Sequence, residues 1–147
     1  MFNAVHFYRL GRKLFLWRIP LLPKLIELII FLLYNSKIPT SCEIGGGSFF
    51  SYGGIGVVLH ARCKIGENVD IGTNVTIGGK SGNFEVPIIG NNVYIATGAK
   101  ILGSIKVGNN VTIGANAVVI NDVPDNAIMA GVPARLIKYK QISSQIH

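Results

Sequence analysis

Residues 64–79 read KIGENVDIGTNVTIGG, and residues 107–119 return to the same pattern as VGNNVTIGANAVV. In both stretches a large aliphatic residue recurs every six positions, and a second apolar residue stands two positions before it. Residues two apart on a strand point the same way, so each hexad predicts a short strand with two inward side chains. Three positions after the aliphatic residue comes a residue such as Asn or Gly, which tolerates the left-handed backbone of a sharp corner. This alternation of strand and corner predicts a parallel β-solenoid.

The six-residue period extends through most of the chain with one interruption. Its large aliphatic positions are Leu59, Ile65, Ile71, Ile77, Ile89, Ile95, Ile101, Val107, Ile113 and Val119. Its corner positions are Arg62, Asn68, Asn74, Asn92, Gly98, Ser104, Asn110, Asn116 and Asp122. One hexad is missing before Ile89, so residues 80–86 are predicted to leave the stack as a loop. If three hexads form one coil, Gly78 stacks on His60, and the loop springs from the coil beside this histidine.

Composition and charge divide the chain into three parts. The 147 residues carry a net charge of +7, although only 14% of them are charged. Residues 1–40 form a hydrophobic and basic helical segment, residues 41–134 hold the repeats, and residues 135–147 are a basic tail. The repeat region is close to neutral, which argues against a nucleic-acid partner, because nucleic-acid-binding surfaces are basic. Cys42 and Cys63 have no metal-binding spacing and no signal peptide is recognisable, so we expect a reduced cytoplasmic location with both thiols as apolar fillers.

Residues 1–38 predict two helices separated by the break between Pro20 and Pro23. The second helix has 14 residues, whereas a helix needs about 20 apolar residues to cross a bilayer. Aromatic residues alternate with Arg9, Arg12, Lys13 and Arg18, a combination that suits a helix lying in a membrane interface at the inner face of the cell membrane. Two other roles fit this composition equally well. The helices would then form an oligomer contact, or they would cover the open end of the repeats.

The two quoted runs resemble the hexapeptide-repeat acyltransferases, and residues 96–137 closely resemble the carboxy-terminal half of serine acetyltransferases. The resemblance implies a mainly β fold, a left-handed parallel β-helix, here with a short α-helical N-terminal segment. It also implies acetyl-CoA as co-substrate, no metal, and a homotrimer that holds coenzyme A between neighbouring β-helices. Serine acetyltransferases carry a long helical amino-terminal domain, whereas about 40 residues precede the repeats here. This shorter form resembles acetyltransferases of surface-polysaccharide assembly.

The expected activity is therefore acetyl transfer from acetyl-CoA to a hydroxyl on a sugar of a cell-surface polysaccharide or its precursor. One alternative is serine O-acetylation, which makes O-acetylserine for cysteine synthesis. A second alternative is a non-catalytic β-helix scaffold docked on a membrane. A metal-dependent hydratase would need about three histidine ligands, and the repeats contain His60 alone.

Acetyl transfer to a hydroxyl needs a base for the alcohol proton, and histidine suits this task near neutral pH. We predict His60 as the general base, with Glu43 as its carboxylate partner and Tyr52 as a helper. Backbone N–H groups of the loop would stabilise the oxyanion. A lone histidine at a corner can equally be an ordinary surface residue. The two histidines of the serine acetyltransferase motif would fall near Gly53 and Val86, and their absence weakens the case for serine as acceptor.

Cofactor and substrate residues follow from the same resemblance. Small corner residues would leave room for the pantetheine arm, although packing explains them equally well, and three basic residues would meet the phosphates. The implied cofactor-binding residues are Gly78, Gly79, Lys80, Ser81, Ala96, Thr97, Gly98, Ala115, Gly131, Pro133, Arg135 and Lys138. The loop residues Asn83, Phe84 and Glu85 are predicted to contact the acceptor.

Overall fold

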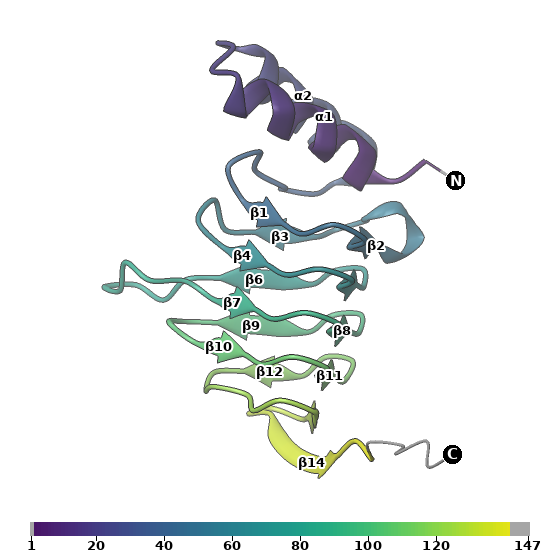
Figure 1. Cartoon of the computed structure of the whole chain (residues 1–147), viewed down its shortest axis with the longest axis vertical. Helices are drawn as coiled ribbons and strands as arrows, with labels where there is room; N and C mark the ends of the chain where they lie inside the picture. Colours follow the sequence, from purple (N-terminus) through teal and green to yellow (C-terminus); the bar gives the residue numbers. More distant parts are fainter. Residues whose placement is uncertain (1, 142–147) are drawn as a thin grey trace, which may run out of the picture.

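The hexads form short strands that wind into a triangular stack of coils, which Figure 1 shows from the side. The computed structural model describes residues 2–141. The β1 sheet contains β1 (Glu43–Ile44), β4 (Lys64–Ile65), β7 (Ile88–Ile89) and β10 (Lys106–Val107). The β2 sheet contains β2 (Phe49–Phe50), β5 (Asp70–Ile71), β8 (Tyr94–Ile95), β11 (Thr112–Ile113), β13 (Ala127–Ala130) and β14 (Arg135–Tyr139). The β3 sheet contains β3 (Val58–Leu59), β6 (Thr76–Gly78), β9 (Lys100–Leu102) and β12 (Val118–Val119). The predicted mainly β fold, a left-handed parallel β-helix, is confirmed.

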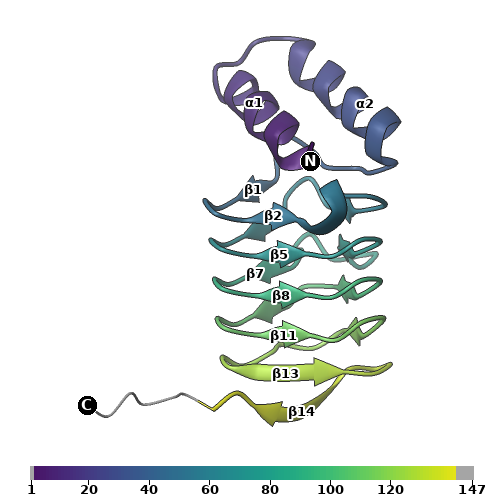
Figure 2. The same cartoon turned by 90° about the vertical axis from the view of Figure 1, so that its right-hand side faces the viewer.

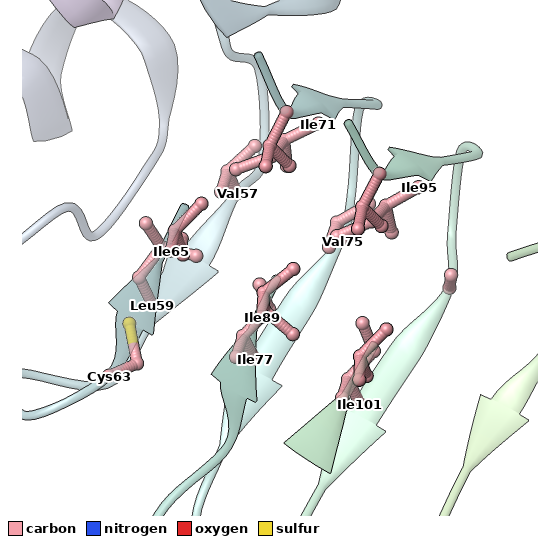
Figure 3. Packing of buried hydrophobic residues seen from close by; sticks show 14 of the residues in the cluster. Val57, Leu59, Cys63, Ile65, Ile71, Val75, Ile77, Ile89, Ile95 and Ile101 are labelled. Carbon is pink, nitrogen blue, oxygen red and sulfur yellow. The ribbon is translucent and has the colours of Figure 1, made fainter. Parts of the chain in front are cut away.

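The interior of the stack consists of the aliphatic side chains that define the period (Figure 3). Ile71 and Ile95, which pair across neighbouring coils, are 1% and 0% exposed, and Ile77 and Ile101 are equally buried. Each layer therefore places the same type of residue on the layer before it. Removing most of one such side chain costs about 2–5 kcal/mol, because the layers on both sides cannot close the cavity.

The three corners of the triangle differ in their backbone conformation. We call residues 67–68, 91–92, 109–110 and 125–126 the asparagine corner. Residues 51–56, 73–74, 97–98 and 115–116 form the small-residue corner, and residues 60–62, 79–86, 103–104 and 121–122 form the loop corner. Six of the nine predicted corner positions have positive φ, and all six lie at the first two corners: Asn68, Asn74, Asn92, Gly98, Asn110 and Asn116.

The other three predicted corner positions require a correction. Arg62, Ser104 and Asp122 do not have positive φ, and all three lie at the loop corner. A side chain such as Arg or Ser is disfavoured in the left-handed region, because its Cβ approaches the following carbonyl oxygen. The chain turns there with other dihedral angles.

Two insertions change the length of individual coils. Tyr94 pairs with Thr112, 18 residues later, which is the spacing of three hexads. Phe49 pairs with Asp70, 21 residues later, because the 3₁₀ turn Ser51–Gly53 lengthens the small-residue corner. The third coil is longer again because residues 79–86 leave the stack as the predicted loop, although strands β6 and β7 on either side keep their register.

Two helices lie across the N-terminal end of the stack (Figure 2). They are α1 (Ala4–Leu16) and α2 (Leu22–Tyr34), which begins with Pro23 in its first turn. Tyr8 of α1 is fully buried and donates its hydroxyl hydrogen bond to the carbonyl oxygen of Cys42. Burial raises the pKa of Tyr8 to about 12, so this donor stays protonated at neutral pH. No helix of the described residues is long and apolar enough to cross a bilayer.

The helices cover the open end of the repeats, which is one of the roles that the sequence left open. The Arg9 guanidinium donates to the carbonyl oxygens of Ile44 and Gly45. Arg12 donates to those of Thr40 and Ser41, each at 3.1 Å. The prediction that Arg9 and Arg12 meet lipid therefore needs correction, because both side chains point into the protein and satisfy carbonyl groups of the first coil.

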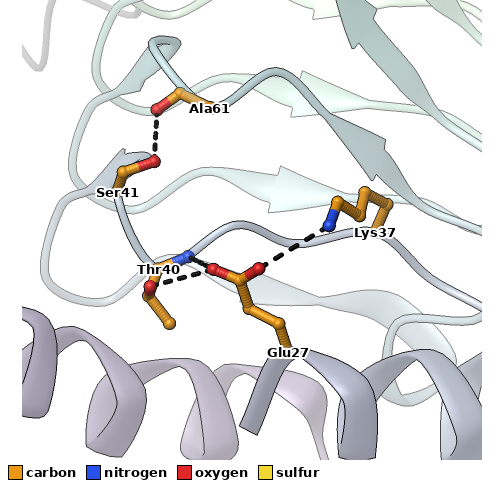
Figure 4. A network of polar contacts seen from close by, with 5 residues as sticks. All are labelled: Glu27, Lys37, Thr40, Ser41 and Ala61. Atoms are coloured by element: carbon orange, nitrogen blue, oxygen red, sulfur yellow. Dashed lines mark hydrogen bonds and ion pairs between the residues drawn. The ribbon is translucent and has the colours of Figure 1, made fainter. Parts of the chain in front are cut away.

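Glu27 fixes α2 to the segment that enters β1, as Figure 4 shows. Its Oε1 accepts hydrogen bonds from Thr40 N at 2.8 Å and Thr40 Oγ1 at 2.9 Å, while Lys37 Nζ lies 3.6 Å from Oε2. The adjacent Ser41 hydroxyl donates to the carbonyl oxygen of Ala61 at 2.9 Å. This chain of contacts connects the helices to the loop corner.

The far end of the stack is covered by an antiparallel strand. Strand β14 pairs with β13, so residues 135–139 are not a simple tail as predicted. An unpaired β13 edge would expose its backbone N–H and C=O groups, and β14 occupies them. The rest of the predicted tail, residues 142–147, lies outside the described residues.

Candidate active site

His60 stands at the loop corner, at the end of β3. Its backbone N–H donates to the carbonyl oxygen of Ile77 at 2.9 Å, so His60 stacks on Gly78 as predicted. The half-buried ring faces the start of the loop, since its Cδ2 would lie 3.9 Å from a Cβ atom at Gly79. His60 Nδ1 accepts a hydrogen bond from Arg62 N–H at 3.1 Å. In this state a neutral ring carries its hydrogen on Nε2.

The loop is held against the coils before and after it. The Arg62 guanidinium lies 4.0 Å from the ring centroid of Phe84 and donates to the Phe84 carbonyl oxygen at 2.5 Å. On the other side, the Ser104 hydroxyl donates to Glu85 Oε2 at 2.8 Å. Two coils therefore set the position of the loop.

Two pockets flank the loop, one on each side. The first, with a volume of about 530 Å³, is lined by Arg62, Lys64, Phe84, Glu85, Val86, Ile88, Ser104, Ile105, Lys106 and Asp122. The second, of about 550 Å³, is lined by Gly79, Lys80, Asn83, Leu102, Gly103, Ser104, Ile105, Ile120 and Asn121. The loop thus separates the predicted acceptor residues, because Asn83 faces one pocket whereas Phe84 and Glu85 face the other.

Within one chain the structure does not bring the predicted partners of His60 to it. Tyr52 lies in the 3₁₀ turn at the small-residue corner, with its side chain 75% exposed. Glu43 lies on β1 opposite Lys64 and is also exposed, and no described hydrogen bond connects it to His60. Prediction grouped these residues by counting hexads, and the three extra residues of the 3₁₀ turn make that count fail.

The two positions where related sequences place histidine are closed in this fold. A Cβ atom at Gly53 would lie 3.0 Å from the carbonyl oxygen of Phe2, and Gly53 has φ of +82°. Val86 is buried, with 8% of its surface exposed, in the apolar core. The departure from the serine acetyltransferase motif is therefore part of the local packing.

The predicted cofactor residues fall into three groups. Gly78, Gly79, Lys80 and Ser81 begin the loop. Ala96, Thr97, Gly98 and Ala115 belong to the small-residue corner or border it. Gly131, Pro133, Arg135 and Lys138 lie in the turn after β13 and in β14. The conformation of Gly98 has a structural cause of its own, because φ is +76° and a Cβ atom would lie 1.9 Å from Asn116 Oδ1.

Cys42 and Cys63 stack on each other in neighbouring coils. Both are buried, and their Sγ atoms are 2.7 Å apart. The hydrogen bond between the thiols, together with burial, holds the pKa of Cys42 well above its usual range. A neutral, enclosed thiol is a poor nucleophile, in agreement with the prediction that these residues are fillers. The described residues contain no group of three His, Cys, Asp or Glu side chains able to hold a metal ion.

Sequence reasoning missed the two residues that anchor the loop, Arg62 and Ser104. Both occupy corner positions at which most other hexads have Asn or Gly. A corner residue that cannot be explained by left-handed backbone was the available signal for a side chain with another role.

Comparison with known proteins places these features in a family context. Residues 87–121 match the family described as bacterial transferase hexapeptide (six repeats). The chain is 38% identical to a serine acetyltransferase of Staphylococcus xylosus over 138 residues, which cover 92% of this chain and 63% of that protein. It is 36% identical to the serine acetyltransferase of Synechococcus elongatus, with 92% and 56% covered. This chain therefore spans about three fifths of the length of these relatives.

Solved structures of the same enzyme have the same fold. A serine acetyltransferase in complex with CoA superposes with a TM-score of 0.82 and 36% identity, covering 91% of this chain and 55% of that one. The Neisseria gonorrhoeae serine acetyltransferase superposes with a TM-score of 0.87 and 30% identity, covering 95% and 55%. The chain is thus built from bacterial transferase hexapeptide repeats and resembles the hexapeptide-repeat acyltransferases, serine acetyltransferase above all.

Proposed function

We propose that this protein transfers an acetyl group from acetyl-CoA to the hydroxyl of serine. The observation that carries the proposal is the position of His60 beside the loop, in a chain that matches serine acetyltransferases over 92% of its length. These relatives support serine, the alternative acceptor, better than the polysaccharide sugar that the short N-terminal segment suggested. A relative whose structure is described as a complex with CoA supports acetyl-CoA as the donor.

In the proposed mechanism, His60 Nε2 takes the proton of the serine hydroxyl while the oxygen attacks the thioester carbonyl. The tetrahedral intermediate places its negative oxygen near the backbone N–H groups of Gly79 and Lys80. The carbon–sulfur bond then breaks, and the CoA sulfur takes the proton from the imidazolium. Nε2 can accept a proton only when the ring hydrogen is on Nδ1. The contact between Nδ1 and Arg62 N–H therefore opens when the acceptor binds.

We propose further that the functional unit is a homotrimer, because one subunit separates the two halves of the cofactor site. Five residues of the β3 sheet lie between Gly98 and Gly103, a span of about 16 Å. A neighbouring subunit would bring its small-residue corner, including Tyr52, against the loop corner of the first. The acetyl-CoA arm would then lie between two prisms, whose flat walls enclose little space on their own.

The acceptor is tested by measuring thioester loss from acetyl-CoA with serine, a nucleotide sugar and a lipid-linked sugar. We expect turnover with serine and none above background with either sugar. Turnover with a sugar alone would overturn the serine assignment and restore the polysaccharide reading. Absence of turnover with all three, by a protein that also fails to bind acetyl-CoA, would favour the non-catalytic scaffold.

The shared site is tested by mixing two inactive variants, His60→Ala and Ala115→Leu, in the unfolded state and refolding them together. If each site combines the loop corner of one subunit with the small-residue corner of the next, random assembly restores about one quarter of the native activity. If each site lies within one subunit, the mixture stays inactive. Each variant refolded alone provides the baseline.

A further inference from the structure

The outer face of the two helices is unusually apolar. Strand edges and carbonyl groups of the first coil occupy the inner face, whereas large apolar side chains on the outer face have no contact with the solenoid. On α2, Leu21, Leu25, Leu28 and Leu32 follow helical spacing along one side and are 81%, 50%, 50% and 71% exposed. Trp17, in the turn between the helices, is 69% exposed. We call these five residues the outer cap face.

The charges around the outer cap face all have one sign. Lys13, Arg18 and Lys24 are exposed and lie within four positions of Trp17, Leu21 or Leu28. Glu27 is the one acidic residue between positions 2 and 34. Its carboxylate is turned inward to Thr40 and Lys37. The described helices therefore present apolar and positive groups outward without a compensating negative charge.

We propose that the outer cap face docks on the headgroup region of an anionic lipid bilayer. Apolar side chains enter the interface, and basic side chains at its rim meet acidic headgroups. A second copy of this chain is a poorer occupant, because a symmetric contact would bring three cations of each copy together in a desolvated interface. This inference concerns a surface of the helices and does not depend on the proposed acetyl transfer.

The structure also determines which basic residues to change. Arg9 and Arg12 satisfy carbonyl groups of the first coil, so replacing them would test folding rather than lipid binding. Replacing Lys13, Arg18 and Lys24 together with Gln removes the outward charge and leaves the inner contacts intact. The matched control replaces Lys64, Lys106 and Lys140 of the solenoid with Gln, which removes the same charge from elsewhere.

Sedimentation of the full chain with phosphatidylglycerol-containing vesicles at low salt measures the partition coefficient. We expect the helix triple variant to bind about 100-fold more weakly, from about 1 kcal/mol for each basic side chain near the surface. The solenoid control should bind as the native chain does. A second variant, Trp17→Ser with Leu21→Ser and Leu32→Ser, should lose binding while circular dichroism and the melting temperature stay unchanged.

Three results would overturn the proposal. The first is native binding by the helix triple variant. The second is equal binding of the native chain to purely zwitterionic vesicles, which would remove the anionic headgroup from the inference. The third is absence of vesicle binding together with concentration-dependent doubling of the assembly that the serine variant abolishes, which would assign the face to a second copy.

Discussion

The loop corner and the small-residue corner stack the same number of turns, yet they are built under different constraints. At the small-residue corner Asn74, Gly98 and Asn116 turn the chain in the left-handed region. At the loop corner Arg62 and Ser104 do not, and their side chains hold the loop beside His60. A corner that must be left-handed accepts few residue types. The corner without that requirement is free to carry a ring nitrogen, a guanidinium and a carboxylate.

This contrast assigns different tasks to the two corners. The loop corner supplies groups that transfer protons, and the small-residue corner offers exposed backbone and short side chains to a long, flexible ligand. Substitutions at the loop corner should therefore lower turnover. Substitutions at the small-residue corner should weaken acetyl-CoA binding or destabilise the fold.

The largest effect is expected at His60. Replacing His60 with Ala should lower kcat about 10²–10⁴-fold, because the acceptor proton loses its base, while the affinity for acetyl-CoA stays close to native. Steady-state kinetics combined with equilibrium binding of acetyl-CoA measures both quantities. His60→Gln serves as the comparison, since Gln keeps a hydrogen-bond donor but cannot act as a base. Native turnover by the Gln variant would show that His60 acts as a donor.

A smaller effect is expected at Ala115, an exposed residue of the small-residue corner. Ala115→Leu should raise KM for acetyl-CoA about tenfold, on the order of 1.4 kcal/mol, because the added side chain occupies the wall that receives the cofactor. The melting temperature should not change. The matched control is Glu67→Leu at the asparagine corner, where an exposed residue receives the same side chain. An equal rise of KM in the control would contradict the separate task of the small-residue corner.

The smallest effect is expected at Asn116, whose φ is +56°. Asn116→Ala should lower the free energy of unfolding by about 1 kcal/mol, since Ala is strained in the left-handed region. Turnover per folded molecule should stay native. Asn116→Gly should keep the native stability, because Gly adopts this conformation without strain. Urea denaturation of both variants checks the prediction, and an unchanged stability of the Ala variant would remove the backbone explanation of this corner.

The solenoid could be predicted because one physical rule acts again at every coil. Ile71, Ile77 and Ile95 occupy equivalent inward positions, so each repeat confirms the previous one. The stacking of His60 on Gly78 followed from this count. Tyr52 could not be placed in the same way, since its 3₁₀ turn adds residues in a stretch without a hexad signature.

The helices show a different limit of sequence reasoning. Arg9 and Arg12 share a helical face with Val5 and Tyr8, which is the face that packs on the first coil. Composition alone counts such arginines as surface charge. Only the open end of the solenoid, with carbonyl groups that need donors, explains why they point inward. A non-repeating contact between two unlike elements leaves no periodic signal in the chain.

The loop leaves and re-enters the stack without disturbing the pairing on either side. Strand β6 remains aligned with β3 and β9, and β7 remains aligned with β4 and β10. Residues 80–86 can therefore be lengthened, shortened or exchanged while the surrounding coils keep their sheet pairing, because loop-closure free energy grows only slowly with length. Acceptor preference then becomes a transplantable property. A loop grafted between Gly79 and Pro87, with Arg62 and Ser104 redesigned to hold it, would change what the scaffold recognises without a new fold.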